Sequence, residues 1–241
     1  MIIDRHSPSS LNKFAASPSM YVMEKILGMK QAVGALAHRG TAVEYGVSTG
    51  LADLKLDPDA CVEAALERYD YLTSVDDPKK ADVRVDIPPM TKMALDELRQ
   101  YGTPTRTQYF CEWRPEGLKY PIIGYLDYAW DDLGVLTDLK TTQSCPKAIK
   151  PSHARQVALY ATSNNLAGKV TYVTGKRRAT YDVDNIQQHR NALHRIAINC
   201  ERFLALSDDP EFYLGILAPD IEHYFFAPEE VRKAAFNLWG I

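Results

Sequence analysis

The chain has 241 residues, of which 46% are hydrophobic and 24% are charged. These proportions are typical of a soluble globular protein, and the length suits one large domain or a domain with an added lobe. The longest apolar stretches span only a few residues, far short of the roughly 18 that a membrane-spanning helix needs. The sequence from Met1 to His6 shows neither the basic start nor the apolar segment of a signal peptide. We therefore expect a cytoplasmic protein without a membrane partner.

The net charge of −3 conceals an uneven distribution along the chain. Residues 51–100 include 12 acidic and 7 basic residues, whereas residues 146–190 include 8 basic and 2 acidic ones. These segments are either two solvated surfaces of different charge, or the basic one contacts phosphate groups. The densest basic run is Lys176-Arg177-Arg178, which fits a clamp on DNA at a hairpin as well as it fits a solvated turn.

The four cysteines are scattered and form no C-x-x-C pair. Neither a zinc site nor a disulfide framework is therefore indicated. We expect buried free thiols at Cys61, Cys111, Cys145 and Cys200.

Helical periodicity dominates the N-terminal part of the chain. Ser7 is a suitable N-cap for a helix over about 7–30. Residues 51–105 could form a helical side lobe. No Gly/Ser/Pro-rich linker separates them from the rest of the chain, so we expect a single domain that spans 1–241. The further helices predicted here cover residues 34–50, 58–74 and 90–101.

The pattern changes to strands after residue 106. Segments rich in aromatic and β-branched residues, separated by turn signals, predict an antiparallel meander of three strands. The order of elements favours an α/β or α+β fold, with a central mixed β-sheet flanked by helices. The strands are expected over 107–114, 120–130, 134–141, 169–174 and 179–183. The remaining helices are expected over 152–164, about 184–206 and about 228–239.

The most informative residues lie on the second and third predicted strands. Asp127 closes a G-x-x-D motif, and a D-x-K motif begins eleven residues later at Asp138. Because side chains alternate along a strand, Asp138 and Lys140 should point the same way, with Leu139 directed into the core. Two carboxylates and the Leu139 carbonyl would offer the oxygen ligands that hard cations such as Mg²⁺ prefer. A lysine beside them can orient and help to deprotonate a water for in-line attack on a phosphodiester.

Other polar residues can be interpreted in two ways. Gln156 and Tyr160 stand four residues apart on the next predicted helix, so they share one face of it. His153 and Arg155 flank this pair and either touch phosphate or belong to a plain helix surface. Glu44 lies on the predicted helix 34–50, where an isolated acid is most simply a solvated side chain. A D-x-K tripeptide, taken alone, is also common as a surface ion pair.

Together these motifs resemble the PD-(D/E)XK nucleases, in the branch of RecB-type and phage recombination exonucleases. The family's order is an S-x-S-x-L-x-x-F helix start, a first motif after a glycine, then G-x-x-D, D-x-K and Q-x-x-x-Y. The corresponding residues here are Ser7 to Phe14, Gly40 to Glu44, Gly124 to Asp127, Asp138 to Lys140, and Gln156 to Tyr160. The matches extend over about residues 7–160.

The resemblance implies a restriction-endonuclease-like core and a role for each matched residue. Asp127 and Asp138 would bind Mg²⁺ or Mn²⁺ directly, and Glu44 would bind it directly or through water. Lys140 would activate the nucleophile, while Gln156 and Tyr160 (the Q-x-x-x-Y pair) would position that lysine and the DNA backbone. The Leu139 carbonyl would add a metal ligand.

The resemblance also implies an activity. The expected enzyme is a stand-alone DNA exonuclease that leaves 5′-phosphate and 3′-hydroxyl ends during recombination, repair or DNA degradation, and a phage origin fits its compactness. An endonuclease on the same fold and a catalytically inactive DNA-binding module are the alternatives. DNA is the expected substrate. The sequence does not determine whether the protein forms a homo-oligomer or binds a recombination partner protein.

Two features depart from the family pattern. Iron–sulfur members of this branch carry Cys-Pro where this chain has Ser17-Pro18, and the C-terminal cysteine cluster is missing, so we predict no iron–sulfur cluster. RecB-type members usually carry His in the first motif, where this chain has Glu44. His38 lies six positions earlier, which is not the same helical face, so packing or DNA contact suits it better than metal binding.

Overall fold

The computed structural model describes residues 3–29 and 33–241, which fall into two compact units. We describe each unit separately. The expectation of one domain with a side lobe over about 51–105 stays a prediction. The terminal unit contains 3–29, 112–124 and 187–241, and the sheet unit contains 33–111 and 125–186.

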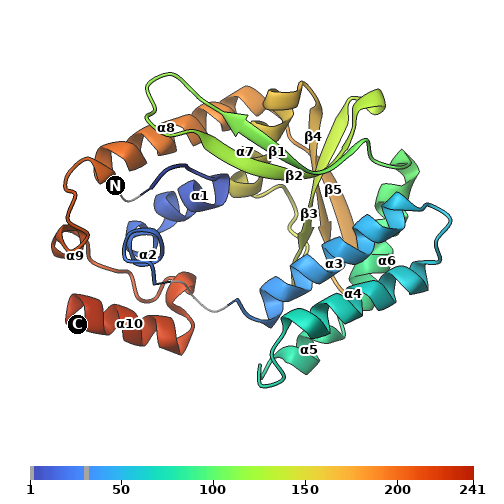
Figure 1. Ribbon diagram of the computed structural model, residues 1–241, viewed down its shortest axis with the longest axis horizontal. Helices are drawn as coiled ribbons and strands as arrows, with labels where there is room; N and C mark the ends of the chain where they lie inside the picture. Colours follow the sequence, from blue (N-terminus) through green and yellow to red (C-terminus); the bar gives the residue numbers. More distant parts are fainter. Residues whose placement is uncertain (1–2, 30–32) are drawn as a thin grey trace. The chain divides into compact units, whose positions relative to one another are not determined.

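A mixed five-stranded sheet has the order β1-β2-β3-β4-β5 (Figure 1). Strand β2 pairs antiparallel with β3, β3 pairs parallel with β4, and β4 pairs antiparallel with β5. Helix α7 (Pro151–Asn164) provides the crossover that a parallel pair requires. The predicted mixed sheet flanked by helices is therefore confirmed. The strands are Arg106–Trp113, Ile122–Trp130, Val135–Thr141, Ala167–Val173 and Arg178–Asp182.

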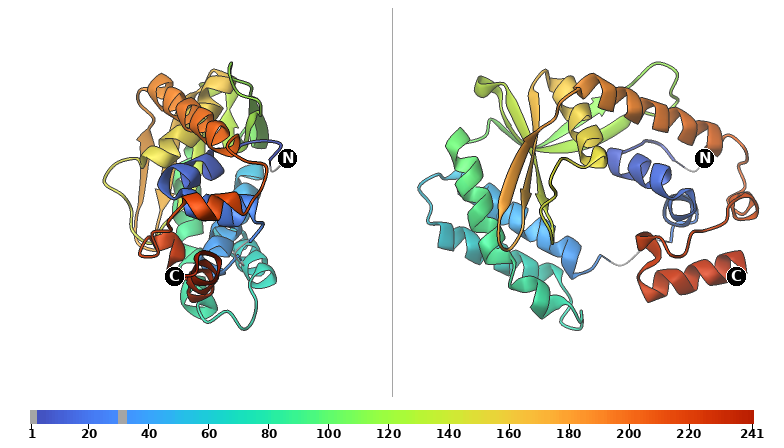
Figure 2. Two further views of the ribbon diagram at one scale, coloured as in Figure 1. Left: turned by 90° about the vertical axis from the view of Figure 1, so that its left-hand side faces the viewer. Right: turned by 180° about the vertical axis from the view of Figure 1, so that it is seen from behind.

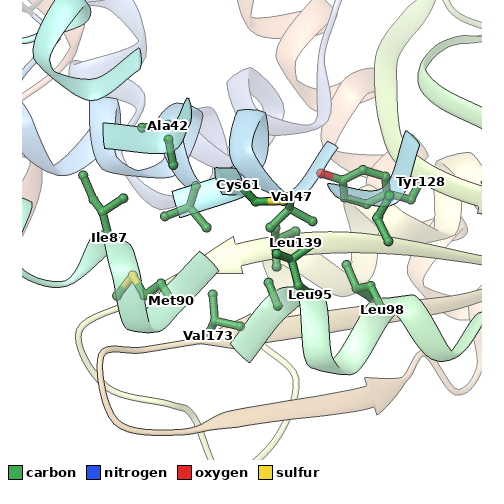
Figure 3. Close-up of a cluster of buried hydrophobic side chains, with 14 of the residues drawn as sticks. Ala42, Val47, Cys61, Ile87, Met90, Leu95, Leu98, Tyr128, Leu139 and Val173 are labelled. Atoms are coloured by element: carbon green, nitrogen blue, oxygen red, sulfur yellow. The ribbon is translucent and has the colours of Figure 1, made fainter. Parts of the chain in front are cut away.

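Three helices form a layer along one side of the sheet (Figures 1 and 2). Figure 3 shows the buried side chains that join this layer to the strands, among them Val47, Leu95, Tyr128 and Leu139. Leu139 is 8% exposed and points into this core, as strand alternation predicts. The helices are α3 (Ala35–Ala52), α4 (Pro58–Leu72) and α6 (Ile87–Leu98).

The predicted helix boundaries in this layer need small corrections. Helix α6 begins at Ile87 and not at residue 90, because prolines are tolerated in the first helical turn, where no backbone N–H partner is needed. It ends in a 3-10 turn over Arg99–Tyr101. The short helix α5 (Lys80–Arg84) was not predicted, since five residues carry too little periodicity to be recognised.

The first helix of the terminal unit is interrupted, so the prediction of one continuous helix over 7–30 is wrong. Ser7 does act as an N-cap and forms a capping box with Ser10. The helix stops at Ser17, whose backbone is extended and whose side chain caps the next helix by accepting a bond from the Met20 N–H. Pro18 favours such a restart because it lacks an N–H. The observed elements are α1 (Pro8–Ala16), α2 (Pro18–Tyr21) and a π-helix over Val22–Ile26; residue 30 lies outside the described residues.

The rest of the terminal unit is mostly helical. Glu201 ties it together, because its carboxylate contacts the His6 ring at 3.1 Å and accepts bonds from the backbone N–H groups of Lys119 and Tyr120. Phe226 is fully buried in a second hydrophobic cluster. The elements are α8 (Ile186–Leu204), α9 (Phe212–Ile216), a 3-10 turn over Tyr224–Phe226 and α10 (Glu229–Trp239).

Two expectations from composition can be compared with the structure. All four cysteines are buried and unpaired, as predicted. Within residues 3–29 and 33–241, no helix combines the length and the apolar character needed to cross a bilayer.

Gly46 allows α3 and α4 to approach closely, which gives a test of the helical layer. A Cβ atom at this position would lie 2.5 Å from the Cys61 carbonyl oxygen and 2.8 Å from the Ala65 Cβ. Gly46→Ala should therefore lower the free energy of unfolding by about 1–3 kcal/mol in urea denaturation. Gly40→Ala on the same helix is the matched control, because its Cβ would meet only Thr141 Oγ1 at 3.4 Å. Equal stability of the two variants would contradict the close approach.

Candidate active site

Two aspartates lie side by side on neighbouring strands of the sheet unit. Asp127 is 9% exposed and Asp138 is fully buried. Continuing the register that pairs Tyr128 with Thr137 places these aspartates opposite each other. Asp127 Oδ2 accepts a hydrogen bond of 2.8 Å from the Leu139 backbone N–H. The antiparallel pairing of β2 and β3 therefore brings two carboxylates together in a nearly dry environment.

Lys140 is the cation beside these acids. Its Nζ lies 2.6 Å from Asp138 Oδ2, and both side chains point to the same side of β3, as strand alternation predicts. Among the described residues, Asp138 Oδ1 has no hydrogen-bond donor, and Oδ2 has no partner apart from this ion pair. A buried carboxylate with an unpartnered oxygen is costly, so Asp138 has capacity for a further positive partner.

Glu44 and Gln108 complete the cluster from α3 and β1. The Gln108 side-chain amide donates to Glu44 Oε1 and, at 3.3 Å, to Asp127 Oδ1. Gln108 has a φ of 45°, in the left-handed region that residues other than glycine seldom adopt. Strained backbone of this kind is often found at functional sites. The sequence analysis missed Gln108, because a single glutamine in a strand belongs to no motif and carries no periodic signal.

The electrostatic balance of the site is negative. Burial raises the pKa of Asp127 well above its usual value, and the charges of Asp138 and Glu44 raise it further. Burial and the charge of Asp138 likewise raise the pKa of Glu44. Burial alone would lower the pKa of Lys140, but the surrounding carboxylates outweigh it and raise this pKa. Three acids thus share one ammonium group.

This chemistry fits a divalent cation, although no complete cage is formed. Carboxylate oxygens are the ligands that hard cations prefer, and the excess negative charge and the unpartnered Asp138 oxygen favour one. Across residues 3–29 and 33–241, no three His, Cys, Asp or Glu side chains converge closely enough to hold a metal ion. Gln108 bridges Glu44 and Asp127, while Lys140 pairs with Asp138.

Helix α7 contributes Gln156 and Tyr160. The Gln156 side-chain amide donates to the Tyr160 hydroxyl at 3.1 Å, so the two residues share a face as predicted from their spacing. Tyr160 is 2% exposed. Burial raises the pKa of its hydroxyl, and the charge of Asp138 adds to this effect. The pair is therefore within electrostatic range of the carboxylates.

His153, at the start of α7, makes a contact inside the protein. Its Nδ1 lies 2.8 Å from the hydroxyl of Tyr172, the residue that pairs in register with Lys140. Burial and the charges of Lys140 and Lys150 lower the pKa of His153 to about 4. The imidazole is therefore neutral at physiological pH, and any contact with phosphate would be that of a neutral hydrogen-bonding group.

The predicted basic residues are held in different ways. Arg178 forms ion pairs with Asp96 and, at 3.0 Å, with Glu97 on α6. Arg177 donates to the Cys145 carbonyl oxygen at 2.7 Å, and Lys176 is exposed.

Two further predicted residues contact their own surroundings. Arg155 is partly buried, which lowers its pKa. His38 Nδ1 lies 3.2 Å from Thr73 Oγ1, a contact within the helical layer.

Comparison with known proteins identifies the family of the chain. Residues 5–222 match the family model of the PD-(D/E)XK nuclease superfamily. The chain belongs to this superfamily. Its members are hydrolytic nucleases and generally use divalent metal ions. The cluster around Asp127 and Asp138 is therefore the candidate active site of a nuclease.

Solved structures support the fold. A protein from Eubacterium rectale, proposed to be an exonuclease, has a crystal structure with a TM-score of 0.60 and 16% sequence identity. The similarity covers 94% of this chain and 88% of that one; at this identity it shows the fold alone. The structure of SSO0001 has a TM-score of 0.40 at 15% identity over 78% of this chain and 93% of that one. No curated protein matches the sequence.

The lowered pKa of His153 predicts a pH-dependent loss of stability. The group has a pKa near 6.5 when unfolded and about 4 when folded, so protons bind the unfolded chain more readily between these values. The free energy of unfolding should fall as the pH drops from 6.5 towards 4. His153→Gln, which can keep the bond to Tyr172, should remove roughly 1–2 kcal/mol of this loss, less than the full shift because the ring is partly solvated. Urea denaturation of both proteins at pH 7 and pH 4.5 measures this loss in the free energy of unfolding. An NMR titration that places the pKa of His153 above 6 would contradict the prediction.

Proposed function

We propose that the protein is a metal-dependent DNA exonuclease of the RecB-type and phage recombination branch, which leaves 5′-phosphate ends. The observation that supports this proposal is the convergence of Asp127, Asp138 and Lys140 from two adjacent strands. The similarity to a fold neighbour that is proposed to be an exonuclease favours the same activity, without deciding between end-dependent and internal cleavage. Recombination, repair or DNA degradation in the cytoplasm is the proposed setting.

The proposed metal ligands are the carboxylates of Asp127 and Asp138. Glu44 would bind directly or through water once its contact with Gln108 is released, and the Leu139 carbonyl is a further candidate ligand. A bound Mg²⁺ or Mn²⁺ would polarise the scissile phosphate and increase the acidity of the attacking water. The unpartnered oxygen of Asp138 is the structural feature that best supports this assignment.

The protein's own groups would orient the reactants. The Lys140 ammonium, held at Asp138, would position the attacking water and stabilise negative charge that develops on the phosphate. Gln156 and Tyr160 would in turn restrict the position of Lys140 and of the DNA backbone. Their mutual hydrogen bond fixes both side chains before DNA binds, which reduces the entropic cost of orienting them later.

Contacts with the DNA backbone are proposed for the basic segment. Lys176 is the best candidate in the run 176–178, because Arg177 and Arg178 already have partners within the chain. Arg155 and His153 would lie nearer the chemistry, on the helix that carries Gln156. Charge on the side chains of this segment would attract phosphates and release counterions.

Asp138→Asn tests the assignment of the active site. Loss of the buried charge should remove metal binding and lower the cleavage rate at least about 10³-fold, while DNA binding in EDTA stays nearly unchanged. Asp132→Asn, at an exposed aspartate between β2 and β3, is the matched control. Cleavage of labelled DNA and calorimetric titration with Mn²⁺ give the two readouts. Wild-type cleavage by Asp138→Asn would reject the assignment of the active site, whereas absence of cleavage by the wild-type chain would favour the inactive DNA-binding module.

The choice between exonuclease and endonuclease needs a substrate without ends. Linear duplex DNA should be degraded in the presence of Mn²⁺, whereas covalently closed circular DNA of the same sequence should persist, because an exonuclease needs an end to begin. Gel electrophoresis over a time course measures both. Rapid nicking or loss of the closed circle would support the endonuclease on the same fold.

A further inference from the structure

Two exposed aromatic rings lie in contact on adjacent strands of the sheet unit. Phe110 on β1 is 44% exposed and Tyr125 on β2 is 53% exposed. Their ring centroids are 5.6 Å apart, with planes inclined at 62°. Burial of these rings would have stabilised the fold, so a pair left open to solvent is available to a ligand.

The pair lies next to the candidate active site. Gln108 on β1 contacts Asp127 on β2. Phe110 lies two residues after Gln108, and Tyr125, the ring that it contacts, lies two residues before Asp127. Two strand residues correspond to about 7 Å, which is about two nucleotides at the roughly 3.4 Å spacing along one strand of a duplex. Tyr125 and Asp127 also share a face of β2 by alternation. A DNA strand with a phosphate at the carboxylates could therefore place a neighbouring base at the rings.

The chemistry of the surroundings favours bases over phosphates as the ligand. The two rings carry no charge that could pair with a phosphate, and Gln108, two residues from Phe110 on β1, contacts the acids Glu44 and Asp127. Stacking of a base on a neutral ring needs no positive charge and tolerates any sequence, since every base has a π-face. The neighbouring Tyr109 is less available, because the Arg106 guanidinium lies over its ring at 4.7 Å.

We propose that Phe110 and Tyr125 form a stacking platform for unpaired bases beside the scissile phosphate. The preferred substrate is then single-stranded DNA or the frayed end of a duplex, because base faces inside a duplex are covered by their neighbours. This inference rests on the proposed nuclease function, and it specifies the form of DNA that reaches the site.

The test compares DNA binding by ring-deletion variants of the full chain. Phe110→Ala and Tyr125→Ala should each weaken binding of a fluorescein-labelled single-stranded oligonucleotide about tenfold, as loss of base stacking does. Fluorescence anisotropy in EDTA measures binding without cleavage. An oligonucleotide of the same length with abasic sites keeps the phosphates but lacks bases, so the substitutions should not weaken its binding further. Binding of a blunt duplex should change less than twofold.

Matched variants separate stacking from other effects. Phe110→Tyr and Tyr125→Phe keep a ring and should retain affinity. Leu133→Ala removes an exposed apolar side chain (57% exposed) from the turn between β2 and β3 and should leave binding unchanged. Thermal melting shows whether each variant is folded.

Three results would overturn the platform. The first is unchanged affinity of both alanine variants for the single strand. The second is an equal loss of affinity for single-stranded, abasic and duplex DNA. The third is a change of oligomeric state in the alanine variants, measured by light scattering, which would make the rings a contact between copies of the chain. Any of these results, together with normal cleavage that depends on Asp138, would reject the platform alone. Absence of cleavage by the wild-type chain would reject the nuclease proposal instead.

Discussion

Repulsion between buried carboxylates is the physical constraint around which the candidate active site is organised. Asp127 and Asp138 lie opposite each other with little access to water, and Glu44 adds a third negative charge. Burying such charges costs several kcal/mol each unless partners compensate them. The Leu139 backbone N–H and the Lys140 ammonium compensate only in part. The fold therefore maintains a negative, incompletely satisfied cluster, which is the environment that a divalent cation stabilises.

The same strands that create this cluster also hold it in place. Along β3, Leu139 points into the helical layer, while Asp138 and Lys140 on either side of it belong to the site. Core packing and the site are therefore coupled through one backbone. Tyr128 does the same on β2, because its buried hydroxyl donates to the Glu44 carbonyl at 3.1 Å and lies 3.0 Å from Ser48 Oγ. Helix α3, which carries Glu44, is thereby attached to the strand that carries Asp127. Gly46 on the same helix allows α4 to approach closely.

Binding of DNA to such a negative cluster needs attractive forces from elsewhere. Part of the basic charge in residues 146–190 is already used inside the protein, as the ion pairs of Arg178 with α6 and of Lys169 with Asp182 show. The His153 imidazole is neutral at physiological pH. The proposed stacking on Phe110 and Tyr125 would supply binding energy that does not depend on charge. In this arrangement base stacking would add to the attraction that a bound divalent cation would exert on the phosphate.

The sequence by itself determined most of the elements and the direction of the key side chains on β3. Alternation along β3 was enough to place Asp138 and Lys140 together, because the direction of a strand side chain is a local property. Even the break at Ser17 was open to prediction from Pro18, although the helical pattern concealed it. Only the tertiary structure brought Gln108 to the carboxylates and Phe110 to Tyr125, because contacts between distant residues depend on which strands are neighbours and on an unusual backbone conformation at one position. Propensity and motif spacing contain no information of that kind.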